Sequence, residues 1–286
     1  MTMKAVGVIG AGLMGSGIAE VAALNGFEVV LRSRSQSTAD AALGRVSQSL
    51  AKSVDRGKLA ADARDETMDR LRATDDLGEL ELCDLVIESV VEDLDTKQRL
   101  FRELDRICAP SAYLATNTST LPVVEMAIAT ERPDRVIGLH FFNPAPRMPL
   151  VEVVPALTTS PATVDAAREF AAQCGKDPVT VKDKAGFIVN ALLFPYLNSA
   201  VHMLDNGVAT KEDIDTAMRG GCGFPMGPLE LLDLVGLDTS LAILNALNAE
   251  QPGGCTAPAP LLKRMVAAQQ LGRKTGQGFY TYESAR

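Results

Sequence analysis

The sequence predicts an α/β protein in which a doubly wound, mostly parallel sheet is followed by an all-helical domain. Strand-like and helix-like runs alternate over residues 1–185. A glycine-rich turn joins the first strand to the first helix, and the pattern becomes helical from Gly186 onward. We therefore expect a sheet domain at residues 1–185 and a smaller helical domain at residues 186–286.

The first strand begins near Lys4 and runs into the segment Gly10-Ala-Gly12-Leu-Met-Gly15, which opens a helix. This is the Rossmann-type dinucleotide-binding pattern. Its first glycine allows a tight turn, its second lets backbone amides approach a pyrophosphate, and its third lets helix and strand pack closely. A purely structural turn and a signal peptide are the alternatives. The regular glycines and the helix that follows them disfavour the signal peptide.

The second strand, residues 27–32, is followed by a segment at residues 36–75 that predicts a helical hairpin. An apolar stripe with spacings of three and four consists of Leu43, Val46, Leu50 and Val54, and Gly57 interrupts it. About half a turn away, a basic face consists of Arg45, Ser49, Lys52 and Arg56. Either this face is solvated, as such faces ordinarily are, or it holds the phosphorylated tail of a ligand.

The later elements continue the alternation of strands and helices. Further strands are expected at residues 83–88, 111–116, 135–140, 150–154 and 178–181, with a helix at residues 96–107. In the second domain, residues 187–204 and 211–218 predict helices. Thr210 is a cap for the second of these, and Gly220-Gly221 is its stop signal.

His140 is the most informative residue, because it is one of two histidines and ends an apolar run just before a proline-rich break. Open α/β sheets bind ligands at the carboxyl edge of their strands, and an imidazole titrates near neutral pH. Glu152 lies among branched apolar residues, so it needs a partner that offsets its desolvation. A catalytic His–Glu pair is one interpretation. A hydrogen-bonded core histidine beside an ordinary strand glutamate is the other.

Composition limits the class of partner. The formal net charge of −8 disfavours nucleic acids and anionic membrane surfaces, because both attract basic proteins. The five cysteines show no Cys-x-x-Cys spacing and the two histidines are distant, so we expect neither disulfides nor a metal site. No uninterrupted apolar run reaches the ~20 residues that span a bilayer. We therefore expect a soluble, cytoplasmic protein that acts on a small molecule.

Six ordered motifs span the chain. They are residues 8–17, Asn117-Thr-Ser119, His140-Phe-Phe-Asn-Pro-Ala-Pro146, Gly186-Phe-x-x-Asn190, Pro225-Met-Gly-Pro228 and residues 271–280. Together they resemble the 3-hydroxyacyl-CoA dehydrogenase family, and the bacterial 3-hydroxybutyryl-CoA dehydrogenases most closely. The resemblance implies reversible hydride transfer between a nicotinamide dinucleotide and carbon 3 of an acyl-CoA. This reaction interconverts 3-hydroxyacyl and 3-ketoacyl thioesters such as 3-hydroxybutyryl-CoA and acetoacetyl-CoA.

The resemblance also implies catalytic roles. His140 matches the general acid/base, which takes the hydroxyl proton in oxidation and returns it in reduction. Glu152 matches the carboxylate that orients and supports this histidine. Ser119 and Asn190 match the residues that hydrogen-bond the reacting oxygen and orient the thioester. Both also fit the alternative of helix or turn caps.

Binding roles follow from the same resemblance. The residues that match cofactor-binding positions are Gly10, Gly12, Leu13, Met14, Gly15, Glu92, Lys97, Asn117, Ser119 and Asn143. Glu92 and Lys97 also fit the alternative of surface charges at a helix start. Lys52 and Arg56 match positions that meet the CoA phosphates, which gives the basic face a second interpretation.

Two positions depart from the family's pattern. Ser33 ends the second strand, where relatives carry an aspartate that binds ribose hydroxyls. A carboxylate there repels a 2′-phosphate, whereas a hydroxyl beside Arg32 and Arg34 can bind one, so we expect a preference for NADP(H) over NAD(H). If Arg34 instead stacks on adenine or points to water, NAD(H) is still used. Ala191 replaces an arginine found in many relatives, which weakens expectations about polar contacts of that helix.

Three alternatives make different demands on the sequence. A short-chain dehydrogenase needs Tyr-x-x-x-Lys, which no tyrosine here supplies. A hydroxyacid dehydrogenase acting on a non-CoA substrate carries a lysine on the linking helix, and residues 185–210 contain none. A crystallin-like nucleotide-binding protein would keep the fold without turnover, whereas the intact catalytic positions favour an enzyme. The apolar stretches at residues 229–235 and 241–247 predict a homodimer through the C-terminal domain.

Overall fold

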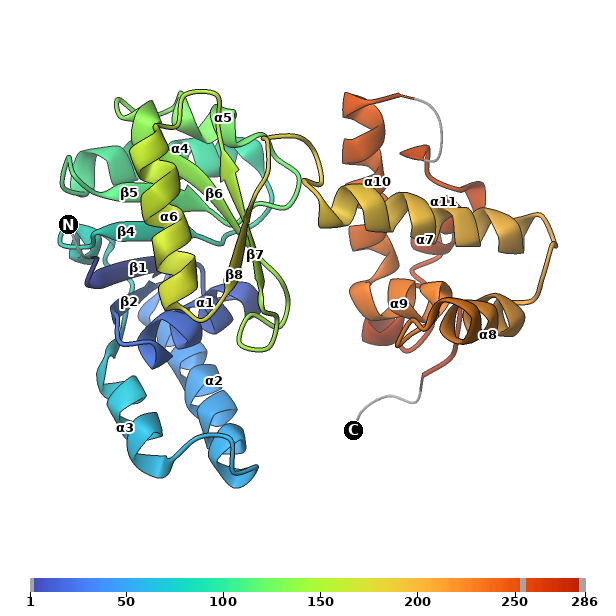
Figure 1. Ribbon diagram of the computed structural model, residues 1–286, viewed down its shortest axis with the longest axis horizontal. Helices are drawn as coiled ribbons and strands as arrows, with labels where there is room; N and C mark the ends of the chain where they lie inside the picture. The colour runs from blue at the N-terminus through green and yellow to red at the C-terminus, as the bar shows by residue number, and fades with distance from the viewer. Residues whose placement is uncertain (1–2, 253–255, 283–286) are drawn as a thin grey trace. The chain divides into compact units, whose positions relative to one another are not determined.

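The chain forms two compact units (Figure 1). The computed structural model describes residues 3–252 and 256–282. The first unit ends at Asp183 and the second begins at Lys184. The first contains a sheet flanked by helices and the second is helical, so the predicted fold class is confirmed.

Within the described residues, one sheet of eight strands forms the centre of the first unit, in the order β3-β2-β1-β4-β5-β6-β7-β8. The strands are β1 (Ala5–Ile9), β2 (Glu28–Arg32), β3 (Leu71–Thr74), β4 (Leu85–Glu88), β5 (Tyr113–Thr116), β6 (Val136–Phe141), β7 (Leu150–Pro155) and β8 (Asp177–Thr180). Neighbouring strands pair in parallel, except that β6 and β7 are antiparallel. The strand order reverses between β1 and β4, and open α/β sheets bind ligands at such a switch point.

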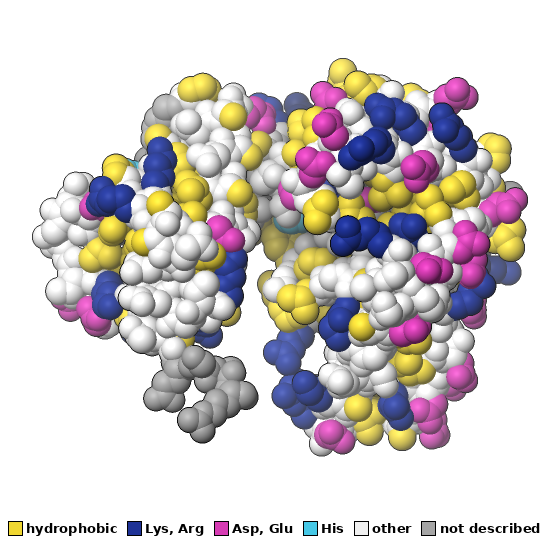
Figure 2. Space-filling view, turned by 180° about the vertical axis from the view of Figure 1, so that it is seen from behind, with side chains coloured by type: hydrophobic (Ala, Val, Ile, Leu, Met, Phe, Trp, Pro, Cys, Tyr) yellow, Lys and Arg dark blue, Asp and Glu magenta, His cyan; other side chains and the backbone are white. Residues whose placement is uncertain are grey.

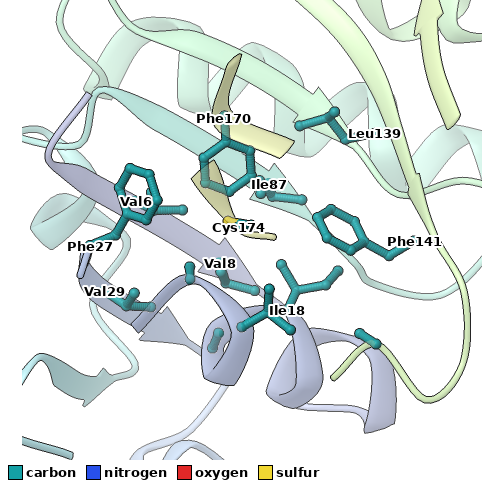
Figure 3. Packing of buried hydrophobic residues seen from close by; sticks show 14 of the residues in the cluster. Val6, Val8, Ile18, Phe27, Val29, Ile87, Leu139, Phe141, Phe170 and Cys174 are labelled. Carbon is teal, nitrogen blue, oxygen red and sulfur yellow. The ribbon is translucent and has the colours of Figure 1, made fainter. Parts of the chain in front are cut away.

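Helices cover the sheet. They are α1 (Leu13–Leu24), α2 (Gln36–Asp55), α3 (Ala61–Asp69), α4 (Leu94–Ile107), α5 (Val123–Ala127) and α6 (Pro161–Gln173), with short 3-10 turns η1 (Leu77–Leu80) and η2 (Pro133–Arg135). Apolar side chains of α1 and α6 pack with those of β1 and β2 in one buried cluster (Figure 3). Within this cluster the rings of Phe27 and Phe170 meet edge to face, with centroids 5.2 Å apart. Such a contact contributes about 0.5–1.5 kcal/mol beyond the area it buries.

Capping side chains fix where several helices begin. Ser35, Asp93 and Ser160 each accept a hydrogen bond from the backbone N–H three residues later, at the starts of α2, α4 and α6. Such a cap satisfies one of the N–H groups that a helix leaves unpaired, which contributes about 1 kcal/mol. The α4 cap starts this helix at Leu94, two residues before the predicted start.

Several expected element boundaries differ from the structure, and two of these differences have a clear physical reason. The hairpin expected at residues 36–75 contains α2 and α3 but ends in β3, an edge strand with only two buried side chains. A four-residue edge strand has too few buried positions to give a strand pattern. The second error is the stop signal at Gly220-Gly221, because α8 continues to Cys222. Gly223 ends the helix instead, since it adopts the left-handed conformation with φ 69°.

The second unit is built from helices around its own core. They are α7 (Val189–Asp205), α8 (Lys211–Cys222), α9 (Pro228–Val235), α10 (Leu237–Glu250) and α11 (Pro260–Ala267), followed by the 3-10 turn η4 (Arg273–Thr275). The expected cap is confirmed, since Thr210 accepts a hydrogen bond from Asp213 N–H. Asp233 on α9 accepts hydrogen bonds from the N–H groups of Phe279 and Tyr280, so it links the last described segment to this helix. Across the described ranges, no helix has both the length and the apolar character to cross a membrane.

Candidate active site

His140 and Glu152 form a buried pair on neighbouring strands. They are register partners in the antiparallel pairing of β6 and β7, and His140 Nδ1 lies 2.7 Å from Glu152 Oε2. Glu152 is 0% exposed and His140 is 4% exposed. When ionised, Glu152 can only accept hydrogen bonds, so Nδ1 is then the donor of this contact. In that tautomer the second ring nitrogen, Nε2, is an acceptor.

Ser119 is placed against that second nitrogen. Its Oγ lies 3.0 Å from His140 Nε2. Ser119 follows β5, next to β6 in the sheet, so the two side chains come from the carboxyl ends of adjacent parallel strands. The structure thus aligns Ser119, His140 and Glu152 in one hydrogen-bonded chain, the arrangement that general acid/base catalysis by histidine requires.

Asn117 connects the His140 strand to the start of the glycine turn. Its Oδ1 accepts the N–H of Phe141 at 2.8 Å, and its Nδ2 donates to Ser89 Oγ at 3.4 Å. Ser89 in turn lies against the turn, because a Cβ at Gly10 would be 2.2 Å from the Ser89 carbonyl oxygen. The glycine turn and the His140 strand are therefore linked through two residues. Asn143, in the loop after β6, is exposed.

The glycine turn has the shape that a dinucleotide requires. Gly10 has φ 118°, and a Cβ at Gly15 would lie 1.8 Å from the Gly10 carbonyl oxygen, so both positions exclude a side chain. At Gly12, by contrast, no atom lies within 4 Å of where a Cβ would be. In the described chain, the first turn of α1 has no acidic residue and no side-chain cap. Its N–H groups and the open space at Gly12 fit a bound pyrophosphate.

Glu92 and Lys97 lie in a polar network behind Ser119. Lys97 Nζ contacts Glu88 Oε1 at 2.6 Å and Glu92 Oε2 at 3.2 Å. Glu92 Oε1 accepts the backbone N–H of Ser119 at 2.9 Å. Burial raises the pKa of the Glu92 carboxyl, but the Lys97 ammonium and hydrogen bonds from Thr118 and Ser119 outweigh it, so the pKa lies below its ordinary value. The alternative of independent surface charges is wrong for Lys97, which is 1% exposed.

The end of β2 carries the two residues expected to select the cofactor. Ser33 is buried, and its Oγ lies 2.6 Å from Thr38 Oγ1. Arg34 is exposed. Sequence reasoning missed Arg45, whose guanidinium donates to the Ala11 carbonyl in the glycine turn and to Ser16 Oγ at 3.4 Å. Its membership of the basic face was visible in the sequence, but its contact with the turn was not.

A basic cavity lies between α1, α2 and the loop after β6. Its volume is about 540 Å³, and its cationic lining consists of Lys52, Arg56, Lys58 and Arg147. Glu20 and Ser49 also line it, and Ser49 Oγ donates to Glu20 Oε1 at 2.9 Å. Burial raises the pKa of Glu20. In the space-filling view, Lys and Arg side chains gather at the lower edge of the first unit (Figure 2). Lys52 and Arg56 were predicted from the sequence, whereas Arg147, which a separate loop contributes, was not.

Asn190 belongs to the second unit. It is buried in the first turn of α7, just after two residues with positive φ, Gly186 at 73° and Phe187 at 49°. The structure thus brings together Ser119, His140 and Glu152 in the first unit and places Asn190 at the start of the second.

A glycine turn of this geometry, a His–Glu pair at the carboxyl edge of the same sheet and a separate helical unit define a two-domain nicotinamide-dinucleotide dehydrogenase. Comparison with known families makes the assignment specific. Residues 5–184 match the family model of the 3-hydroxyacyl-CoA dehydrogenase NAD binding domain, and residues 186–282 match the C-terminal domain of the same family. The chain therefore belongs to the 3-hydroxyacyl-CoA dehydrogenase family, is an enzyme and uses a nicotinamide dinucleotide.

Individual relatives match over their whole length. A 3-hydroxybutyryl-CoA dehydrogenase of Mycobacterium tuberculosis is 49% identical over 98% of this chain and 99% of its own. The crystal structure of M. tuberculosis FadB2 superposes with a TM-score of 0.97 at 48% identity, covering 99% of this chain and 100% of that one. The (S)-3-hydroxybutyryl-CoA dehydrogenase PaaH1 from Ralstonia eutropha gives a TM-score of 0.96 at 39% identity, with the same coverage.

Proposed function

We propose that this enzyme interconverts 3-hydroxybutyryl-CoA and acetoacetyl-CoA, with His140 as the general acid/base. The observation that carries the proposal is the chain from Ser119 Oγ through the imidazole to Glu152, with contacts of 3.0 and 2.7 Å. The relatives named 3-hydroxybutyryl-CoA dehydrogenase support the choice of substrate. Asn117 and Ser89 link this chain to the glycine turn that fits the dinucleotide.

The proton steps follow from the geometry of His140. With Nδ1 protonated toward Glu152, neutral Nε2 accepts the proton of the 3-hydroxyl group in oxidation and returns it to the ketone oxygen in reduction. A nicotinamide dinucleotide would be held by the glycine turn, and it would supply the hydride-transfer chemistry at carbon 3. Glu152 holds the ring in the required tautomer and stabilises the imidazolium that forms. Ser119, whose Oγ lies 3.0 Å from His140 Nε2, is the proposed hydrogen-bond donor to the reacting oxygen.

The basic cavity is the proposed site for the phosphates of the CoA group. Lys52 lies in the last turn of α2, Arg56 directly follows that helix as its C-cap residue, and Arg147 lines the same cavity from the loop that follows β6. Several cations around one cavity favour a polyanion, because each charge-assisted hydrogen bond to phosphate is about twice as strong as a neutral one. This gives the basic face a function in an otherwise acidic protein.

The cofactor preference is proposed to be NADP(H). Ser33 follows β2 at the position where an aspartate would repel a 2′-phosphate. The neighbouring Arg34 is exposed. Among the described residues, Arg34 makes no ion pair within the protein, so its guanidinium is available to a phosphate. Because the Ser33 hydroxyl is already hydrogen-bonded to Thr38 Oγ1, Arg34 is favoured over Ser33 as the main contact of the 2′-phosphate.

The helical unit is proposed to form a homodimer. Several large apolar side chains of this unit are exposed, namely Leu192, Met203, Val208, Phe224 and Leu234. Large apolar side chains of this kind are covered when they lie at an interface between chains. A sedimentation mass of one chain would contradict this proposal.

Steady-state reduction of acetoacetyl-CoA with NADPH and with NADH tests the proposed function directly. We expect turnover with both and a larger kcat/KM with NADPH. A NADPH-to-NADH ratio of kcat/KM below one would overturn the cofactor preference. Binding of dinucleotide without turnover would instead support a crystallin-like protein, and turnover of a hydroxyacid without CoA would support the hydroxyacid dehydrogenase.

A further inference from the structure

Glu88 is a fully buried carboxylate to which the family resemblance gives no role. It is the last residue of β4 and is 0% exposed. Its Oε1 accepts hydrogen bonds from Lys97 Nζ and Val90 N–H, both at 2.6 Å, and its Oε2 accepts one from Thr116 Oγ1 at 2.7 Å. Removing a carboxylate from water costs several kcal/mol unless such contacts compensate it. Hydrogen-bond donors from three separate segments are therefore fixed around one charge.

Lys97 connects Glu88 to Glu92. Its ammonium lies between two carboxylates, 2.6 Å from Glu88 Oε1 and 3.2 Å from Glu92 Oε2. With 1% of its surface exposed, Lys97 is poorly placed to bind a dinucleotide phosphate directly. It is well placed to hold the Glu92 carboxylate, which is otherwise on a loop between β4 and α4.

Glu92 in turn organises the segment that carries Ser119. Its Oε1 accepts hydrogen bonds from Thr118 Oγ1 at 2.5 Å, from Ser119 N–H at 2.9 Å and from Thr120 N–H at 3.1 Å. These donors flank the Ser119 side chain, whose Oγ is 3.0 Å from His140 Nε2. A loop residue can hold a hydroxyl at that distance only if its backbone is fixed by neighbouring contacts.

We propose that Glu88 is a positioning residue that acts through Lys97 and Glu92 to fix Ser119 Oγ against His140 Nε2. The proposal rests on the proposed function in that Ser119 and His140 are taken as reacting groups. Glu88 itself is 0% exposed and its carboxylate is held by Lys97, Val90 and Thr116, so its proposed role is indirect. The competing explanation is that the Glu88–Lys97 pair only stabilises the sheet, in which case its loss lowers stability and leaves Ser119 unaffected.

A double-mutant cycle on kcat distinguishes these explanations. Glu88→Gln removes the charge but keeps the shape, and we expect it to lower kcat about tenfold while the KM for acetoacetyl-CoA changes less than about twofold. In a Ser119→Ala background the same substitution should have no further effect on kcat, because its influence passes through Ser119. Equal effects of Glu88→Gln in both backgrounds would overturn the proposal.

Histidine NMR supplies a readout that needs no turnover. The chain has two histidines, His140 and His202, and His202 lies on α7 in the second unit. Glu88→Gln should move the ring Cε1–Hε1 signal of His140 in the same direction as Ser119→Ala and leave the His202 signal in place. An unmoved His140 signal would overturn the proposal. A moved signal in an enzyme that does not reduce acetoacetyl-CoA would reject the proposed function alone.

Two further variants separate positioning from folding. Thr116→Val removes one donor to Glu88 with little change of shape, so it provides a milder test if Glu88→Gln does not fold. It should shift the His140 signal in the same direction by a smaller amount, and no shift would contradict the proposal. Asp105→Asn is the matched control, because Asp105 forms another largely buried ion pair, 2.6 Å from Arg132 Nε. It should lower the melting temperature but change neither kcat nor the His140 signal.

Discussion

His140 and Glu152 face each other across the antiparallel strands β6 and β7, with Nδ1 and Oε2 2.7 Å apart. Because the side-chain period of a strand is two, this register turns both residues toward the same face of the sheet. The pairing of the two strands therefore fixes the pairing of the two side chains. The register thus places Nδ1 of the ring against the Glu152 carboxylate, and Nε2 lies against Ser119 Oγ.

His140→Ala should abolish turnover without abolishing cofactor binding. Loss of a general acid/base costs about 10²- to 10⁴-fold in rate, whereas the glycine turn that fits the dinucleotide does not use the imidazole. The measurements are kcat for acetoacetyl-CoA reduction and the Kd of the reduced dinucleotide by fluorescence. His202→Ala, which removes the other histidine, should leave both unchanged. A rate for His140→Ala within a few-fold of the native rate would mean that another group is the base.

Glu152→Gln should lower kcat although the side chain keeps its size. A neutral amide at this position can donate to Nδ1 and favour the tautomer that carries its proton on Nε2, which cannot accept the proton of the substrate. The expected loss is about 10²- to 10⁴-fold. Circular dichroism and the melting temperature show whether the variant is folded. Native kcat in a folded Glu152→Gln protein would contradict the proposed role of this carboxylate.

Glu92 should make the stability of the first unit depend on pH in the acid range. Its folded-state pKa is lowered, chiefly by the Lys97 ammonium, from an ordinary value of 4.5. A lowered folded pKa means that Glu92 stabilises the fold above about pH 4.5 and loses this effect as the pH falls through the folded pKa. Urea unfolding should show Glu92→Gln less stable than native protein at pH 6, with the difference shrinking below pH 4.5. A difference that does not change with pH would contradict this assignment.

The sequence predicted the contact between His140 and Glu152 at the strand ends better than the contacts behind them. Periodicity and the glycine spacing were sufficient for β1, the turn and α1, because each rests on local sterics that a short segment displays. The pairing of His140 with Glu152 was predicted as well, since a lone carboxylate in a buried strand demands a partner. Ser119 was identified by resemblance alone.

What could not be predicted depends on contacts between distant segments. Glu88 ends an apolar run, and nothing in that run shows that its carboxylate meets Lys97 and Thr116 from two other elements. Arg147 likewise joins the basic cavity only because the loop after β6 folds back toward α1 and α2. Short edge strands such as β3 have few buried positions, so their pattern is too brief to recognise.

Arg34→Gln should change cofactor selectivity. A charge-assisted hydrogen bond to a 2′-phosphate contributes about 1.5–3 kcal/mol, so its loss should lower kcat/KM for NADPH about tenfold or more. NADH lacks this phosphate, and its kcat/KM should change less than about twofold. Lys4→Gln provides a charge-matched control on the same unit. Equal losses with both cofactors would show that Arg34 does not contact a 2′-phosphate.

The paired substitution Lys52→Gln and Arg56→Gln should weaken binding of the CoA group and leave the chemical step intact. Both residues line the basic cavity at the C-terminal end of α2, and this cavity contains none of Ser119, His140 and Glu152. We expect the KM for acetoacetyl-CoA to rise about tenfold or more, from the loss of two phosphate contacts, with little change in kcat. The native enzyme should show a KM that increases with salt, and the double variant should show a smaller increase, because screening acts on charges that remain.

A substrate without the CoA phosphates tests whether the effect of the double variant arises from phosphate binding in the basic cavity. Acetoacetyl-pantetheine keeps the thioester but lacks the nucleotide phosphates, so its kcat/KM should be the same in native enzyme and in the double variant. If the double variant loses activity equally on both substrates, α2 affects the catalytic groups rather than the phosphates. If neither substrate is affected, the basic face is an ordinary solvated surface, and the phosphates of CoA bind to other residues.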